Sequence, residues 1–86
     1  MEITIYLKNE ILTNSKTIEN IEVLYKKKEK FSGKLSFVNH DPFEIKVYDE
    51  EKDEAEAEHY VYFGRALEIT INYSDGTIKV FKDTID

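Results

Sequence analysis

The stretch LEITINYSDGTIKVFK, residues 67–82, alternates apolar and polar residues on both sides of a turn sequence. Such alternation sends one set of side chains into a core and the other toward solvent, as a half-buried strand requires. Asp75 and Gly76 between two alternating runs are the strongest short signal for a β-hairpin, because a two-residue type I′ turn needs positive φ angles that Gly and Asp tolerate. We therefore predict strands at residues 66–73 and 77–82.

The amino-terminal segment resembles this hairpin. EITI at residues 2–5 occurs again at residues 68–71, and TIE at residues 17–19 is close to TID at residues 84–86. An internal duplication is one hypothesis, and two hairpins built by the same strand rules account for the match equally well. Both readings predict strands at 2–8 and 11–16.

The middle of the chain fits two periods. Residues 21–25 alternate as a strand does, but the apolar residues around them also recur at the three- and four-residue spacing of a helix. We favour a strand, because FSGK at 31–34 is typical of a turn and leads into an alternating run at 35–38. A helix near 17–30 is the alternative.

The next turn signal is NHDP at 39–42, where Asn and Asp bond their own backbone and Pro disfavours a helical residue before it. A strand is predicted at 43–48. The acidic residues that follow have good helix propensity, so a helix near 50–63 is an open alternative. Crowded carboxylates repel one another on a compact element, however, and YVYF is typical of a strand. We therefore predict an acidic loop, with room for one helical turn, before a strand at 59–63.

These elements predict a mainly β fold. The expected architecture is a small antiparallel sheet of about seven or eight short strands, folded as a sandwich or a partly open barrel. An α+β fold with a helix near 17–30 or 50–63 is the alternative. A chain of 86 residues supports one core, and no Pro- or Ser-rich linker divides it, so residues 1–86 are expected to form a single domain.

The composition also bears on the compartment. No stretch approaches the roughly 20 apolar residues that span a bilayer, and MEITIYLKNE lacks the features of a secretory signal, so we expect a cytoplasmic protein without a membrane partner. The absence of cysteine excludes disulfides, thiolate metal sites and cysteine nucleophiles. Eleven lysines against one arginine suggest an AT-rich genome, such as that of a low-GC bacterium or its phage.

The charge of the chain is concentrated in residues 49–58, DEEKDEAEAE. Seven acids and the single Lys52 give this stretch a net charge of −6, which equals the formal charge of the whole chain. Such a patch attracts cationic surfaces over a Debye length, about 8 to 10 Å at physiological salt. Two tyrosines follow it at alternate positions, and tyrosine is enriched at protein interfaces. The residues that we expect to bind a partner are Asp49, Glu50, Glu51, Asp53, Glu54, Glu56, Glu58, Tyr60 and Tyr62.

Other chemistry has weaker support in the sequence. A calcium-binding EF-hand loop that began at Asp49 would need Gly and Glu where Glu54 and Tyr60 stand. His40 and His59 lie nineteen residues apart, with no spacing typical of a metal site or a catalytic triad, and we expect both to be exposed. We therefore expect no metal, no cofactor and no catalytic residue.

The lysine-rich segment KKKEK, Lys26 to Lys30, supports an alternative function. On a strand, Lys26, Lys28 and Lys30 would share one face and follow a phosphate backbone, while sheet aromatics stacked with bases. The protein would then bind nucleic acid or nucleotides. The overall negative charge opposes direct nucleic-acid binding, and lysines on an edge strand also prevent aggregation.

The leading hypothesis is a small acidic protein-binding module. Its acidic loop would dock on the basic surface of a protein that binds nucleic acid, by imitating phosphate charge. In size, charge and β content the chain resembles the small acidic inhibitors that phages and mobile elements direct against host nucleases. Two alternatives are the nucleic-acid binder above and an assembly subunit that self-associates weakly through edge strands or through its opposite charges.

Overall fold

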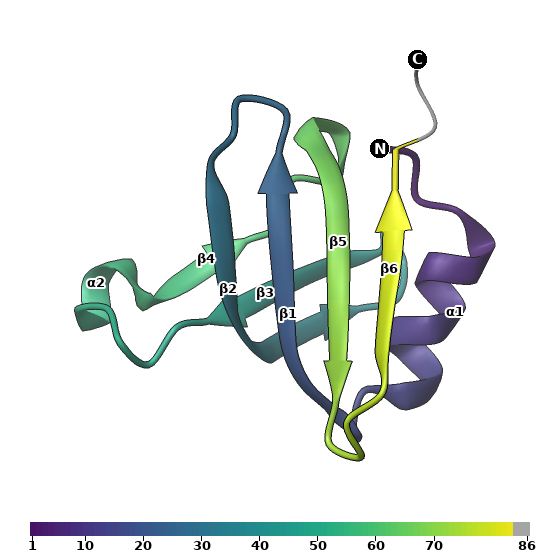
Figure 1. The fold of residues 1–86 in the computed structure, drawn as a ribbon, viewed down its shortest axis with the longest axis horizontal. Coiled ribbons are helices and arrows are strands. Elements are labelled where there is room, and N and C mark those ends of the chain that lie inside the picture. Colours follow the sequence, from purple (N-terminus) through teal and green to yellow (C-terminus); the bar gives the residue numbers. More distant parts are fainter. Residues whose placement is uncertain (84–86) are drawn as a thin grey trace.

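Six antiparallel strands form one open sheet in the computed structural model, which describes residues 1–83 (Figure 1). The order across the sheet is β4-β3-β2-β1-β5-β6. The mainly β, antiparallel fold predicted from the sequence is confirmed, with six strands in place of seven or eight. The strands are β1 (Ile18–Tyr25), β2 (Lys30–Asn39), β3 (Glu44–Tyr48), β4 (Glu58–Tyr60), β5 (Ala66–Tyr73) and β6 (Ile78–Lys82). The helices are α1 (Ile5–Asn14), α2 (Glu54–Ala57) and the 3₁₀ turn η1 (Phe63–Arg65).

Strand β2 folds this sheet on itself. Its first residues, up to Gly33, pair with β1, and the rest, from Lys34 onward, pair with β3. As a result, β3 and β4 cross behind β1 and β5 (Figure 1). Gly33 is buried at the point of transfer, where a Cβ atom would lie 2.4 Å from the backbone oxygen of Tyr48. Only glycine allows the backbones of β2 and β3 to approach so closely.

The core lies between the two halves of the sheet. Alternate residues of β1 and β5 face it, as the period of two requires, and α1 covers one side (Figure 1). A single cluster contains the buried side chains of all these elements. Its fully buried large members are Leu7, Ile11, Ile21, Val23, Ile45, Val47, Val61, Ile69 and Ile71.

The amino-terminal segment forms a helix, so the predicted strands at 2–8 and 11–16 are wrong. The Thr4 hydroxyl accepts the backbone N–H of Leu7 at 3.1 Å and caps α1. Leu7 and Ile11, four residues apart, then face the core from one side of the helix. The proposed duplication therefore has no counterpart in the fold at residues 2–5 and 68–71, and its last part, residues 84–86, lies outside the described residues.

The predicted carboxyl-terminal hairpin is confirmed, but its turn differs from the type I′ geometry. The N–H of Tyr73 donates to Thr77 O and the N–H of Gly76 donates to Tyr73 O, so three residues form the turn. Only Gly76, at φ = 91°, has a positive φ there. This is the geometry of a type I turn closed by a left-handed residue. The Asp75 carboxylate supports it by accepting the N–H of Thr77 at 2.9 Å.

The β1–β2 hairpin repeats this hydrogen-bond pattern. The N–H of Tyr25 donates to Glu29 O, and the N–H of Lys28 donates to Tyr25 O. Lys28 takes the glycine position with φ = 73° and is the one residue other than glycine with positive φ in the described chain. The strand predicted at 21–25 is thus confirmed, whereas the turn predicted at 31–34 is wrong, because these residues continue β2.

The remaining expectations concern residues 39–63. The turn at 39–42 and the strand after it are confirmed, and the acidic segment contains the single helical turn α2. The strand predicted at 59–63 spans Glu58–Tyr60 and ends earlier, because η1 begins at Phe63. The long helices considered near 17–30 and 50–63 do not form. Among the described residues, no helix has both the length and the apolar character needed to cross a membrane.

We predict that Gly33→Ala destabilises the protein by about 1 to 3 kcal/mol, because the added methyl group overlaps rigid backbone atoms of Tyr48. Urea unfolding measures the change. Gly64→Ala is the control, since a Cβ atom there would meet no atom of residues 1–83 within 4 Å. Equal stability of the two variants would contradict the close approach at Gly33.

A second substitution tests the β1–β2 turn. Lys28→Gly is expected to stabilise the fold by up to about 1 kcal/mol, because a side chain in the left-handed region is strained and glycine is not. Lys27→Gly, one residue earlier, should destabilise it by about 0.5 to 1 kcal/mol, since there glycine only adds freedom to the unfolded chain. Thermal melts of both variants would reveal the opposite signs, and a loss of stability in Lys28→Gly would refute the assignment.

Candidate functional site

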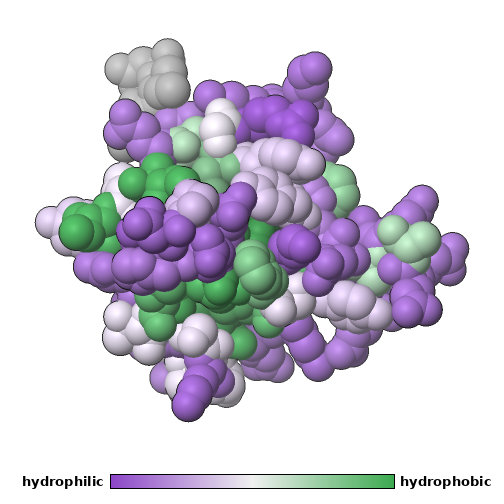
Figure 2. All heavy atoms as spheres, turned by 180° about the vertical axis from the view of Figure 1, so that it is seen from behind, coloured by the Kyte–Doolittle hydropathy of each residue, from purple (hydrophilic) through white to green (hydrophobic). Residues whose placement is uncertain are grey.

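Residues 49–58 project from the end of the sheet, and we call them the acidic projection. In Figure 1 the helix α2 lies at the far left of the molecule, away from the strands. Seen from behind, this lobe is on the right and is mostly hydrophilic (Figure 2). The carboxylates predicted to bind a partner are therefore gathered in one exposed segment.

Three contacts fix the base of the acidic projection. Glu50 pairs with Lys34 at 2.8 Å, and Glu58 pairs with Lys46 at 3.6 Å. The backbone N–H of Asp49 donates to the carbonyl oxygen of Ala57 at 2.8 Å, which closes the segment into a loop whose Ala57 is buried. The backbone bond and the buried Ala57 thus hold the two ends of the projection together, and the two exposed ion pairs add little to them.

The single base of the segment turns back toward the body of the protein. The Lys52 ammonium lies 4.7 Å from the centroid of the Phe31 ring, within the range of a cation–π interaction. Lys52 therefore does not neutralise the tip of the projection.

Four carboxylates of the projection point outward. All are exposed, and none forms an ion pair with any residue of the described chain. Their charges meet solvent, where they act on an approaching molecule with little cancellation from neighbours. These residues are Glu51, Asp53, Glu54 and Glu56.

Tyr60 and Tyr62 lie at the other end of β4 from α2. Their ring centroids are 5.0 Å apart, and the Tyr60 hydroxyl donates to Glu44 at 2.6 Å, a bond that raises the pKa of Tyr60. Tyr62 is 44% exposed, and its ring lies 4.4 Å from the guanidinium carbon of Arg65. Val61 and Phe63, which alternate with the two tyrosines, are buried. The structure thus brings the two tyrosines together with Arg65, beyond β4.

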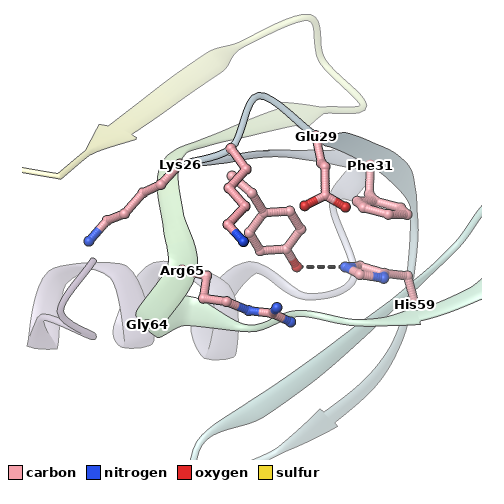
Figure 3. Close-up of a pocket in the computed structure, with 8 residues that line it drawn as sticks. Lys26, Glu29, Phe31, His59, Gly64 and Arg65 are labelled. Atoms are coloured by element: carbon pink, nitrogen blue, oxygen red, sulfur yellow. Dashed lines mark hydrogen bonds between the residues drawn. The ribbon is translucent and has the colours of Figure 1, made fainter.

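A pocket of about 400 Å³ lies between the β1–β2 turn and η1 (Figure 3). The backbone N–H of Lys26 donates to the carbonyl oxygen of Arg65 at 2.9 Å, which holds the two segments side by side. Aromatic rings form one wall: Phe31 and His59 are stacked with centroids 3.9 Å apart, and Tyr25 meets both rings edge to face.

The Tyr25 hydroxyl joins three parts of the chain. It accepts the backbone N–H of Tyr62 at 3.1 Å and lies 2.5 Å from Nε2 of His59 (Figure 3). Which of the two groups donates depends on the tautomer of the neutral His59 ring, because the Tyr25 oxygen has one proton to donate and two lone pairs that accept. This bond connects β1 to β4 at the floor of the pocket.

Burial keeps both partners of this bond neutral. It raises the pKa of Tyr25 and lowers the pKa of His59, and the nearby charges of Lys52 and Arg65 lower the pKa of His59 further. His59 is half-buried, so the expectation that it is an exposed strand-end residue is wrong. His40, in contrast, is exposed in the β2–β3 turn, as expected.

Charged residues surround the mouth of the pocket. Lys26, Lys27 and Arg65 line it together with one acid, Glu29. In Figure 3 the Lys26 side chain extends away from the aromatic wall, while the Arg65 guanidinium and the Glu29 carboxylate approach it from opposite sides. Lys26 also pairs with Asp83 at 3.4 Å. A local excess of positive charge therefore lies on a protein whose formal net charge is −6.

Sequence reasoning did not find this pocket. Lys26 and Lys28 were expected on one strand face, whereas they belong to a turn, and His59 and Arg65 were not connected with it. Basic residues between Tyr25 and Phe31 were the available signal. In residues 1–83, no group of three His, Asp or Glu side chains is placed to hold a metal ion.

Comparisons with known proteins add no relative. No family model matches the chain, and neither a curated protein nor a solved structure is significantly similar to it. The geometry of the acidic projection and of the pocket is therefore what bears on function.

The state of His59 predicts how stability changes with pH. Because the folded protein lowers its pKa, the stabilisation is complete above the ordinary pKa of about 6.5 and is lost as the pH falls toward the lower folded value. We expect urea unfolding to show lower stability at pH 5.5 than at pH 7.5, and a smaller difference in His59→Gln.

His40→Gln is the matched control, since it removes the other histidine from an exposed turn. It should retain the pH dependence of the parent. If His40→Gln and His59→Gln lose the same amount of pH dependence, the partial burial of His59 is not its source.

Proposed function

We propose that this protein is a small binding module whose acidic projection docks on a basic surface of another protein. One observation supports this above the rest: four outward carboxylates without ion pairs among residues 1–83 stand on a projection whose base is fixed. A flexible, well-hydrated connector would not need anchors at both ends. These residues are Glu51, Asp53, Glu54 and Glu56.

The partner that fits this surface best binds nucleic acid. Such proteins carry basic grooves shaped for rows of phosphates, and several carboxylates gathered on one projection can occupy the same groove. We place this encounter in the cytoplasm and suggest a host nuclease as the target, as for the acidic inhibitors of phages and mobile elements. The protein would act by occupying the groove and not by catalysis.

The strength of the interaction follows from the exposure of these charges. An exposed ion pair contributes about 0 to 1 kcal/mol, so the acidic projection alone gives modest affinity. Its larger effect is on the rate of association and on the choice of partner, because complementary fields steer the encounter. Apolar contacts with the partner must supply the remaining affinity.

Neutralising the tip of the projection tests this proposal. A variant with Glu51→Gln, Asp53→Asn, Glu54→Gln and Glu56→Gln should keep its circular dichroism spectrum and thermal stability, because these side chains make no ion pair in the described chain. Immobilised parent protein should retain a nucleic-acid-binding protein from a bacterial lysate, and double-stranded DNA should release it. The variant should lose on the order of tenfold in association rate with that protein.

A control variant with the same net charge separates position from total charge. It carries four neutralised acids outside the projection and should bind as the parent does. Equal weakening of both variants, or retention that DNA does not reverse, would count against docking by the acidic projection. The control substitutions are Glu2→Gln, Glu19→Gln, Glu22→Gln and Asp41→Asn.

A further inference from the structure

We propose that the pocket between the β1–β2 turn and η1 binds a single nucleotide, with the base against the Tyr25–Phe31–His59 wall and the phosphate beside Lys27 and Arg65. This site is separate from the acidic projection. It goes beyond the protein-docking role proposed above, and either can be wrong without the other.

The aromatic wall suits a planar base. Phe31 and His59 are parallel, with an interplanar angle of 1°, and the edge-to-face contacts of Tyr25 with both rings hold the group rigid. The Tyr25 hydroxyl and Nε2 of His59 are hydrogen-bonded to each other, so neither atom needs a hydrogen bond from a ligand. Because the His59 ring and the Lys52 ammonium lie over the two faces of Phe31, a base stacks on the Tyr25 or His59 ring of this wall, and such stacking contributes about 1 to 3 kcal/mol per base.

The cations suit a phosphate. Lys27 and Arg65 come from two different segments that meet at the mouth, and the backbone bond from Lys26 to Arg65 holds these segments side by side. The Arg65 guanidinium carbon lies 4.4 Å from the centroid of the Tyr62 ring, which limits its motion and leaves its N–H groups for an anion. Guanidinium and ammonium groups together are the usual donors to phosphate oxygens.

The carboxylate of Glu29 favours a nucleotide over simpler anions. It approaches the aromatic wall from the side opposite to Arg65 (Figure 3). The Glu29 carboxylate would repel a simple aromatic carboxylate or an inorganic phosphate, or would find no hydrogen-bond donor on it. A nucleotide offers it a donor, either a ribose hydroxyl or an exocyclic amino group of the base.

The size of the pocket limits the ligand to one unit. Sites for small molecules occupy about 300 to 1,000 Å³, and this pocket has about 400 Å³. Gly64 lines the pocket, and a Cβ atom there would meet no described atom within 4 Å. A larger side chain at this position therefore stands at the pocket without overlapping the surrounding backbone.

Nuclear magnetic resonance titration with four probes tests the proposal: AMP, adenosine, inorganic phosphate and a 5′-phosphorylated tetranucleotide. We expect AMP to cause saturable shifts of the amides of Tyr25, Phe31, His59 and Gly64. AMP should bind at least about tenfold more tightly than either fragment, because adenosine lacks the charge-assisted bonds of the phosphate and inorganic phosphate lacks the stacking of the base. If the tetranucleotide binds more tightly than AMP, the natural ligand is the end of a nucleic acid. If it binds equally or more weakly, the natural ligand is a free nucleotide.

Variants connect these shifts to the pocket. Gly64→Leu should abolish AMP binding while the melting temperature remains close to that of the parent, and Arg65→Gln should weaken binding about tenfold. Lys16→Gln, an exposed lysine before β1, should bind as the parent does. If no probe causes saturable shifts at 10 mM, or if folded Gly64→Leu binds AMP normally, the proposed site is refuted. A tenfold loss in Lys16→Gln would also refute it, because attraction by total charge would then explain the binding.

Discussion

The close passage of β2 over the end of β3 is the constraint on which the rest of the fold depends. At Gly33 the strand leaves β1 and begins to pair with β3, with no room for a side chain against the Tyr48 carbonyl group. This transfer turns a flat sheet into two crossing halves with a core between them. It also directs β3 and β4 away from β1, so that the acidic projection stands clear of the sheet while the residues after β4 return to the β1–β2 turn (Figure 1).

Sequence reasoning worked for the fold where one period dominated. The alternation around Asp75 and Gly76 could produce only a hairpin, whereas Ile3 and Ile5 continued an alternating pattern although both are exposed. The decisive signal there was the pair Leu7 and Ile11, whose four-residue spacing was outweighed by apparent repetition. Local pattern shows which period is present, but burial against distant strands decides which one the chain uses.

The sequence predicted the acidic projection but not the pocket, and this difference has a physical reason. The acidic projection is continuous in sequence, so its charge could be counted before its shape was known. The pocket joins Tyr25, Phe31, His59 and Arg65 from separate elements, and only the fold of β2 brings them together. The lysines of the β1–β2 turn were visible, but Lys28 occupies a position where glycine is usual, and this concealed the turn.

The separation of charge within the chain has a colloidal consequence. Outside residues 49–58 the other 76 residues hold eleven acids and eleven bases, so the folded body is close to electrical neutrality. Neutral surfaces lose the mutual repulsion that keeps molecules dispersed, and this body also exposes Ile78 and Val80 on the edge strand β6. One small lobe therefore supplies the long-range repulsion between copies of the protein, and a cationic molecule that neutralised it would bring the assembly nearer to its point of lowest solubility.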